Sequence, residues 1–202
     1  MNPQVWWYVA RGAGITAWLF LTASIMWGIV LTAGLFPKHR RPAWLLDLHR
    51  GLAGLTVGFV AIHIGALVAD NFVHFGLADV VVPFASSWKP WPVALGVLAL
   101  WGLIAVEATS LAMKRLPRST WRAIHFTSYA VFVLASFHGT FAGTDATNPL
   151  YVWTSVAVTV TLMIAVVIRI LGGGRRRPIP PARKQPVGSL SRRVPGEPLI
   201  HH

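Results

Sequence analysis

Four histidines lie in two apolar segments of the chain, in two pairs of similar spacing. His49 and His63 are 14 positions apart, and His125 and His138 are 13 positions apart. An ionisable side chain inside a membrane-spanning helix is costly, so a histidine there usually has a partner and a function. Two such pairs on two helices predict two stacked cofactors, each bound by one histidine from each helix. The cofactor that this arrangement favours is b-type haem, with imidazole on both faces of the iron.

The spacing determines how far apart the two sites lie. A rise of 1.5 Å per residue places the two histidines of one helix about 20 Å apart along its axis. That separation leaves room for two haems within an apolar layer about 30 Å thick. Fourteen residues fall about 40° short of four turns, whereas 13 residues leave the second side chain well over about 90° from the first. The shorter spacing therefore requires a bend or a π-bulge in its helix, or a rotation between the two haems.

A purely structural role and a zinc site both fit the four histidines less well. A single buried histidine is often only hydrogen-bonded to a neighbouring helix, but two pairs at nearly equal spacing argue against that for all four. Zinc is disfavoured because it takes four close ligands and the histidines of one helix are too far apart. The chain has no cysteine, which excludes disulfides, cysteine-ligated iron–sulfur clusters, covalent c-type haem attachment and thiol catalysis.

The composition is that of an all-α integral membrane protein. The 202 residues are 54% hydrophobic and only 12% charged, with a mean hydropathy of +0.58, which separates the chain from soluble proteins. A bilayer span takes about 20 residues. Five stretches reach that length: Gly14–Leu35, Leu45–Ala69, Val93–Met113, Ile124–Gly143 and Leu150–Leu171. We expect no cleavable signal peptide, because Met1–Arg11 lacks a basic region before the first apolar run.

The basic residues predict the orientation. Of the 18 lysines and arginines, 16 flank the first and third connections or lie at Arg169 and beyond, leaving Arg11 and Lys89 on the other side. The positive-inside rule then predicts a bundle of five transmembrane helices with its amino terminus outside and its carboxyl terminus in the cytoplasm. The net charge of +12 would face anionic lipid at the cytoplasmic surface. We expect a multi-pass protein of a bacterial inner or plasma membrane that binds no nucleic acid.

The chain divides into one folded domain and a tail. Residues 1–171 form the haem-binding bundle, and residues 172–202 are too rich in glycine, proline and arginine to bury a core, so we expect a disordered cytoplasmic tail. Trp6, Trp7 and Tyr8 predict an aromatic belt at the outer interface. The segment Asp70–Pro92 is expected to lie on the outer surface as a short interfacial segment.

The second and fourth spans form a weak internal repeat, each with a tryptophan shortly before its first histidine, Trp44 and Trp121. As even-numbered spans of a bundle that starts outside, both run from inside to outside. Parallel helices pair like ends, so the sequence predicts one inner and one outer site. His49 and His125 would bind the inner haem iron, and His63 and His138 the outer one.

Five further residues are secondary candidates. Arg50 and Arg122 flank the inner pair and could bind haem propionates, although both also fit as cytoplasmic anchors. Arg11, at the outer end of the first span, could attract an anionic acceptor or a propionate, or simply extend to the interface. Glu107, inside the third span, could deprotonate a quinol or orient a ligand histidine, or remain neutral and hydrogen-bonded. His74, in the outer loop, could serve an acceptor site or be an ordinary surface histidine.

The segments Leu48–His63 and Trp121–Asp145 resemble the ferric reductase-like transmembrane domain. That family includes the membrane parts of ferric reductases and NADPH oxidases and the haem subunit of periplasmic methionine sulfoxide reductase, and its hallmark is the 14- and 13-residue histidine spacing. Respiratory cytochrome b fits less well, because its spacings are 14 and then 14 or 15. The resemblance covers about Gly14 to Leu171. It implies electron transfer from a cytoplasmic or quinol donor through two b haems to an extracytoplasmic acceptor.

Two departures from the family shape the expected role. The sequence has no glycine fingerprint for a flavin- or nicotinamide-binding domain, and five spans stand where many relatives have six. We therefore expect the electron-transfer subunit of an oxidoreductase, supplied by a separate flavoprotein or by quinol. Its acceptor would be an extracytoplasmic protein, for which a flavoprotein is one candidate. Two alternatives stay open: a self-contained reductase of ferric ion or oxygen at the outer haem, and a haem-free structural or transport membrane protein.

Overall fold

The computed structural model describes residues 4–32, 42–70, 75–143 and 148–172, and all the regular structure in these ranges is helical. Seven helices are found there: α1 (Val5–Thr32), α2 (Trp44–Ala69), α3 (Leu77–Val81), α4 (Pro90–Leu111), α5 (Arg118–Phe126), α6 (Ser128–Ala142) and α7 (Pro149–Gly172). The predicted all-α class is confirmed for the described part of the chain.

Four of these helices, α1, α2, α4 and α7, are long and apolar enough to cross a membrane. Their apolar surface is mostly outside the protein core: between 11% and 33% of the residues in the most apolar window of each helix are buried. A helix that is apolar on all sides and largely uncovered by protein is stable in lipid rather than in water. The described structure therefore has the character of a multi-pass membrane protein.

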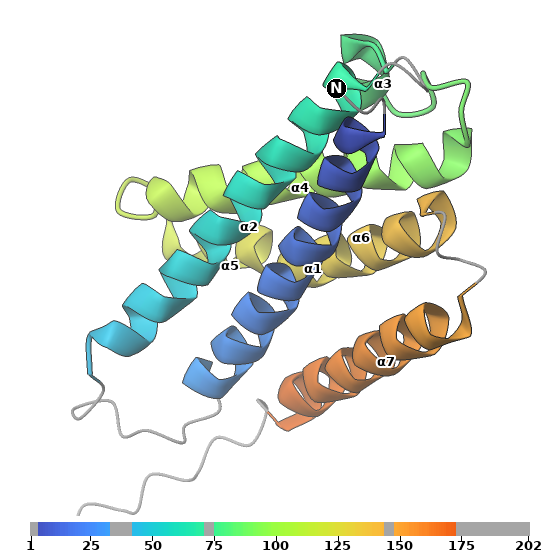
Figure 1. The fold of residues 1–202 in the computed structure, drawn as a ribbon. Helices are drawn as coiled ribbons and strands as arrows, with labels where there is room; N and C mark the ends of the chain where they lie inside the picture. The colour runs from blue at the N-terminus through green and yellow to red at the C-terminus, as the bar shows by residue number, and fades with distance from the viewer. Residues whose placement is uncertain (1–3, 33–41, 71–74, 144–147, 173–202) are drawn as a thin grey trace, which may run out of the picture.

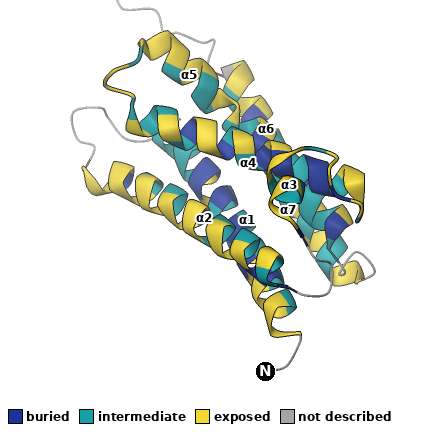
Figure 2. Cartoon of the chain, turned by 90° about the horizontal axis from the view of Figure 1, so that it is seen from above, coloured by how far each residue is buried: buried dark blue, intermediate teal, exposed yellow. Residues whose placement is uncertain are grey.

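The helices form two pairs with α7 beside them. Helix α1 packs along α2, and α4 packs along α6; in the view of Figure 1 the first pair crosses the second at an angle. Helix α1 also contacts α6, and α7 contacts both α1 and α6. The main core lies where these helices meet, and Figure 2 shows its buried positions on the inward sides of α1, α4 and α6. Its buried members are Leu21, Ile25, Ala99, Leu103, Val131, Phe132 and Leu162.

The predicted continuous span Ile124–Gly143 is wrong, because the helix is interrupted at Thr127. The Thr127 backbone N–H donates to the carbonyl oxygen of Ile124 at 3.0 Å, and the Thr127 hydroxyl donates to the same oxygen at 2.6 Å. This i−3 pattern is tighter than an α-helical turn, and a threonine side chain bonded back to the helix often bends it. The distortion required by the 13-residue spacing therefore lies between His125 and His138.

Other boundaries also differ from the sequence prediction. Helix α1 begins at Val5 rather than Gly14, so the aromatic residues Trp6, Trp7 and Tyr8 form its first turns instead of preceding it. The predicted interfacial segment contains α3, and its last residues already belong to α4, which begins at Pro90. Proline suits the first helical turn because its missing N–H has no partner to lose there. Of the predicted tail, residues 173–202 lie outside the described residues.

The segment between α2 and α4 is attached to the helices by side chains. The Trp101 indole on α4 donates to the carbonyl oxygen of Val81 at 2.9 Å, which holds the end of α3 against α4. Lys89 precedes α4 with a left-handed backbone (φ 42°), and its ammonium group donates to the carbonyl oxygens of Phe141 and Ala142 at 3.1 and 3.2 Å. A cation at the last carbonyl groups of α6 is stabilising because it interacts favourably with the helix dipole. Lys89 thus fastens the end of α6 to the start of α4.

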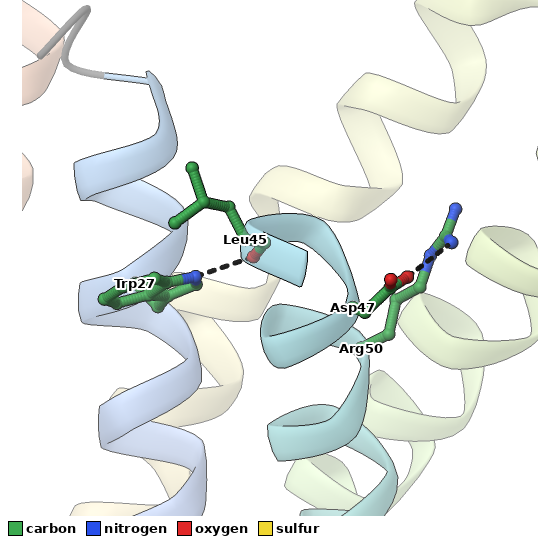
Figure 3. A network of polar contacts seen from close by, with 4 residues as sticks. All are labelled: Trp27, Leu45, Asp47 and Arg50. Carbon is green, nitrogen blue, oxygen red and sulfur yellow. Dashed lines mark hydrogen bonds and ion pairs between the residues drawn. The ribbon is translucent and has the colours of Figure 1, made fainter. Parts of the chain in front are cut away.

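Polar contacts also join the helices at the opposite end of the bundle. The Trp27 indole on α1 donates to the carbonyl oxygen of Leu45 at 2.7 Å, as Figure 3 shows, and so fixes the start of α2 against α1. On α7, Nε of Arg169 donates to the hydroxyl of Thr32 at 2.9 Å. These contacts hold α2 and α7 against α1, which carries part of the site described next.

Candidate cofactor site

The structure brings the four histidines together in the two predicted pairs. The ring centroids of His49 on α2 and His125 on α5 lie 6.1 Å apart, with an angle of 71° between the ring planes. The ring centroids of His63 on α2 and His138 on α6 lie 6.2 Å apart, with an angle of 82°. Among the described residues, no three or more histidine, aspartate or glutamate side chains gather into a possible metal site. The histidines meet as pairs.

Each imidazole is held through its Nδ1 nitrogen. The acceptors for three of them are backbone carbonyl oxygens of a neighbouring helix: Ala10 for His63 at 2.7 Å, Pro92 for His138 at 2.8 Å and Ser24 for His49 at 3.1 Å. A carbonyl oxygen only accepts, so these three rings carry their proton on Nδ1. Nε2 is then the nitrogen with a free lone pair. A histidine ligand of a metal is typically oriented in this way.

Glycines on the neighbouring helices make room for three of these rings. An ideal Cβ on Gly96 would lie 2.6 Å from Nδ1 of His138, and one on Gly14 would lie 3.0 Å from Nδ1 of His63. A Cβ on Gly28 would lie 3.4 Å from Cε1 of His49. Real Cβ atoms essentially never approach within 3.0 Å of another atom, so α4 accepts His138 at this depth only because residue 96 lacks a side chain.

The hairpin of α1 and α2 repeats one contact twice. Ala10 and Gly14 hold His63, and Ser24 and Gly28 hold His49. The two accepting carbonyls are 14 residues apart on α1, and so are the two glycines, as the two histidines are on α2. Equal spacing on antiparallel neighbours places both rings in the same environment. The 14-residue separation of Gly14 and Gly28 is therefore a sequence signal that reasoning from the histidines alone missed.

The fourth histidine has different surroundings. Nδ1 of His125 lies 3.5 Å from the hydroxyl oxygen of Ser110 on α4, and the ring stacks on Trp121 with centroids 5.1 Å apart and an angle of 25°. The indole Nε1 of Trp121 is a buried donor for which no hydrogen-bond partner is found within the described residues. A buried donor without an acceptor is costly. A ligand that brings an oxygen close to the inner pair would satisfy it.

A cavity of about 370 Å³ adjoins the pair of His63 and His138. His63 and His138 line it together with Gly14, Gly96 and Arg11. Its volume lies within the usual range for small-molecule and cofactor sites. Phe75, Asp79, Val80 and Trp88 also contribute to its wall, so the segment before α4 covers one side of it.

The secondary candidate residues differ in their exposure and in whether they line the cavity beside His63 and His138. Arg50 is exposed and forms a 3.5 Å ion pair with Asp47 (Figure 3), and Arg122 is exposed on α5, three residues before His125. Arg11 is half-buried and lines the outer cavity. Glu107 is half-buried on α4 but does not line that cavity. His74 lies outside the described residues.

The residues present fit two b-type haems in three respects. A metal–imidazole bond is about 2.0 Å long, and a ring nitrogen lies about 1.1 Å from the ring centre. Two imidazoles on opposite faces of one iron therefore have centroids about 6.2 Å apart. The observed separations are 6.1 and 6.2 Å. Second, the hydrogen bonds at Nδ1 leave Nε2 of His49, His63 and His138 available to bind iron. Third, a haem propionate would supply an acceptor for the buried indole N–H of Trp121.

Comparisons with protein-family models, with curated proteins and with solved structures find no match for this chain. The functional argument therefore depends on the residues and their geometry.

Proposed function

We propose that this protein transfers electrons across a membrane through two b-type haems, each bound by two histidines. The observation that supports this proposal best is the separation of the ring centroids, 6.1 Å for His49 and His125 and 6.2 Å for His63 and His138. Two imidazoles that share one iron require this separation, and both histidine pairs show it although they lie at different places along the bundle. The same four residues carry the resemblance to the ferric reductase-like transmembrane domain, and we propose membership of that family on this pattern.

When bound, each haem supplies an iron centre that gains and loses one electron. The protein itself would bind each haem and orient the histidines that hold its iron. The Nε2 atoms of the four histidines would be the iron ligands, and the acceptors at Nδ1 fix the ring orientations. The apolar walls of α1, α4 and α6 exclude water from the path between the pairs. Trp121 and, at the outer pair, Arg11 would bind haem propionates.

The distribution of charge gives the two pairs different surroundings. Arg118 and Arg122 on α5 and Arg50 on α2 lie toward the His49–His125 end. By the positive-inside rule this end faces the cytoplasm and the amino terminus lies outside, with α5 and α6 together forming the fourth of five crossings. Electrons would then enter the inner pair from a cytoplasmic flavoprotein or from membrane quinol. They would leave the outer pair for an extracytoplasmic acceptor protein.

The first experiment is a reduced-minus-oxidised optical spectrum of the protein purified in detergent, with haem quantified per chain. We expect the sharp α-band of b-type haem and two haems per polypeptide. The Gly58→Ala variant is a suitable control, since a Cβ there meets nothing within 4 Å. A colourless protein from cells supplied with haem would refute the proposal and leave the haem-free structural or transport role.

A second candidate function is the reduction of ferric ion or oxygen at the outer haem itself. The observation in its favour is that Arg11 lines the same cavity as His63 and His138, because a cation there would attract an anionic ferric chelate or a reduced oxygen species. Stopped-flow mixing of the dithionite-reduced protein with ferric citrate or oxygen tests it. Reoxidation that saturates with the substrate and slows in Arg11→Gln would support this activity, whereas equal slow rates in both proteins would favour the subunit role.

A further inference from the structure

Three of the four histidines are held by one arrangement on the neighbouring helix. A backbone carbonyl at one position accepts from Nδ1, and a glycine four positions later lies against the ring. The three sets are Ala10 and Gly14 for His63, Ser24 and Gly28 for His49, and Pro92 and Gly96 for His138. Residues four apart lie on the same helix face, so each ring contacts one short stretch of exposed backbone.

His125 is the exception, and Ser110 is the reason. Ser110 follows Gly96 by 14 residues, the separation that relates Gly28 to Gly14. It therefore occupies on α4 the position that a glycine occupies in the other three sets. The position that corresponds to the accepting carbonyl is Val106. In its place the hydroxyl of Ser110 faces Nδ1 at 3.5 Å, against 2.7 to 3.1 Å for the three carbonyls.

The two kinds of partner act differently on an iron ligand. A carbonyl only accepts, so it fixes the proton on Nδ1 and draws it away from the ring. A hydroxyl can donate or accept and can rotate, and at 3.5 Å it polarises the ring weakly. An imidazole whose Nδ1–H is strongly bonded is the more basic ligand. It stabilises ferric iron relative to ferrous iron and so lowers the redox potential.

We propose that Ser110 is a positioning residue that raises the redox potential of the inner haem by keeping the Nδ1 of His125 from a backbone carbonyl. This inference rests on the proposed haem function. At His49 the Ser24 hydroxyl also lies 3.3 Å from Nδ1, but the Ser24 carbonyl oxygen is closer, at 3.1 Å. Among the four rings, His125 is the one for which the structure gives a hydroxyl and no backbone carbonyl at Nδ1.

Potentiometric titration of the haem spectrum tests the proposal with two small substitutions of opposite effect. In Ser110→Gly the ring gains access to the carbonyl of Val106, so the potential of one haem should fall. In Ser110→Ala Nδ1 loses its partner, so the potential of the same haem should rise. Shifts of up to about 59 mV are expected, a tenfold change in the ratio of ferrous to ferric haem for a one-electron couple. A purely structural disturbance would move both variants in the same direction.

Two controls complete the test. Thr22→Ala removes a helix hydroxyl on α1 that bonds to the carbonyl oxygen of Trp18, and should leave both potentials unchanged. Gly96→Ala should disturb the other haem and so identify it. Two haems whose potentials do not change in either Ser110 variant, or change with the same sign, would overturn the inference while leaving the proposed function intact. Absence of haem would refute the proposed function itself.

Discussion

The ring of His138 fills the space in which a side chain on Gly96 would begin, since an ideal Cβ at Gly96 would lie 2.6 Å from Nδ1 of that histidine. The same ring donates to the carbonyl of Pro92, one turn earlier on α4. Helix α4 therefore fixes the ring of His138 by contact with bare backbone on one side and by a hydrogen bond on the other.

Alanine substitutions at the three glycines should reduce haem binding in a graded way. Gly96→Ala should displace His138 and cost most of the outer haem, and Gly14→Ala, with its Cβ 3.0 Å from His63, should cost part of it. Gly28→Ala should have little effect, because 3.4 Å is close to ordinary van der Waals contact. Haem per chain in the purified variants measures this order. Equal occupancy in Gly96→Ala and Gly28→Ala would contradict it.

Double histidine variants test which residues share an iron. His63→Ala combined with His138→Ala removes both ligands of one site and should leave one haem per chain. His63→Ala combined with His125→Ala removes one ligand from each site and should leave neither haem with bis-histidine ligation. The two proteins differ only in which second histidine is replaced, His138 or His125. If the first combination lost both low-spin haems, the pairing would be wrong.

The angles between the imidazole planes predict an electron paramagnetic resonance spectrum. The planes meet at 71° in the inner pair and at 82° in the outer pair. Near-perpendicular axial imidazoles leave the iron d orbitals almost degenerate, which gives a highly anisotropic low-spin ferric signal. We expect this signal from both haems at liquid-helium temperature. An ordinary rhombic spectrum, typical of parallel imidazole planes, would show that the rings turn when iron is bound.

Lys89→Gln should destabilise the bundle without removing a ligand. The variant loses two charge-assisted hydrogen bonds to the last carbonyls of α6, an effect of about 1 kcal/mol for an exposed cation at a helix end. Thermal unfolding in detergent, followed by loss of the haem absorbance, measures it. Lys114→Gln, on the exposed turn after α4, is the matched control. Equal unfolding temperatures for the two variants would rule out the capping role.

The sequence predicts the helical class and the histidine pairs well, for a physical reason. Long apolar runs have few stable alternatives to helices in a bilayer, and on parallel helices the nearly equal spacings of 14 and 13 residues let both pairs of histidines meet in one register. The sequence also predicts that the 13-residue spacing requires a distortion. It does not place that distortion, because Thr127 interrupts the helix through local hydrogen bonds that are also compatible with an unbroken helix.

The surroundings of the rings are the part that the sequence did not reveal. On the histidine helix α2 itself, a Cβ at Gly51, Gly54, Gly58 or Gly65 would meet nothing within 4 Å. The glycines that contact the rings, Gly14, Gly28 and Gly96, lie on partner helices. Tertiary packing determines which helices are neighbours, and no single segment of the sequence shows which helix will lie against it. Only the 14-residue repeat on α1 was readable beforehand.

The interruption at Thr127 also divides the two ligands of the second histidine helix between different rigid segments. His49 and His63 both lie on the uninterrupted helix α2. In contrast, His125 belongs to α5, a nine-residue helix with two arginines, and His138 belongs to the apolar α6. In the proposed haem arrangement, a protein or lipid that contacts α5 would act on the inner site through His125. The residues proposed for the outer site, His63 and His138, lie on α2 and α6.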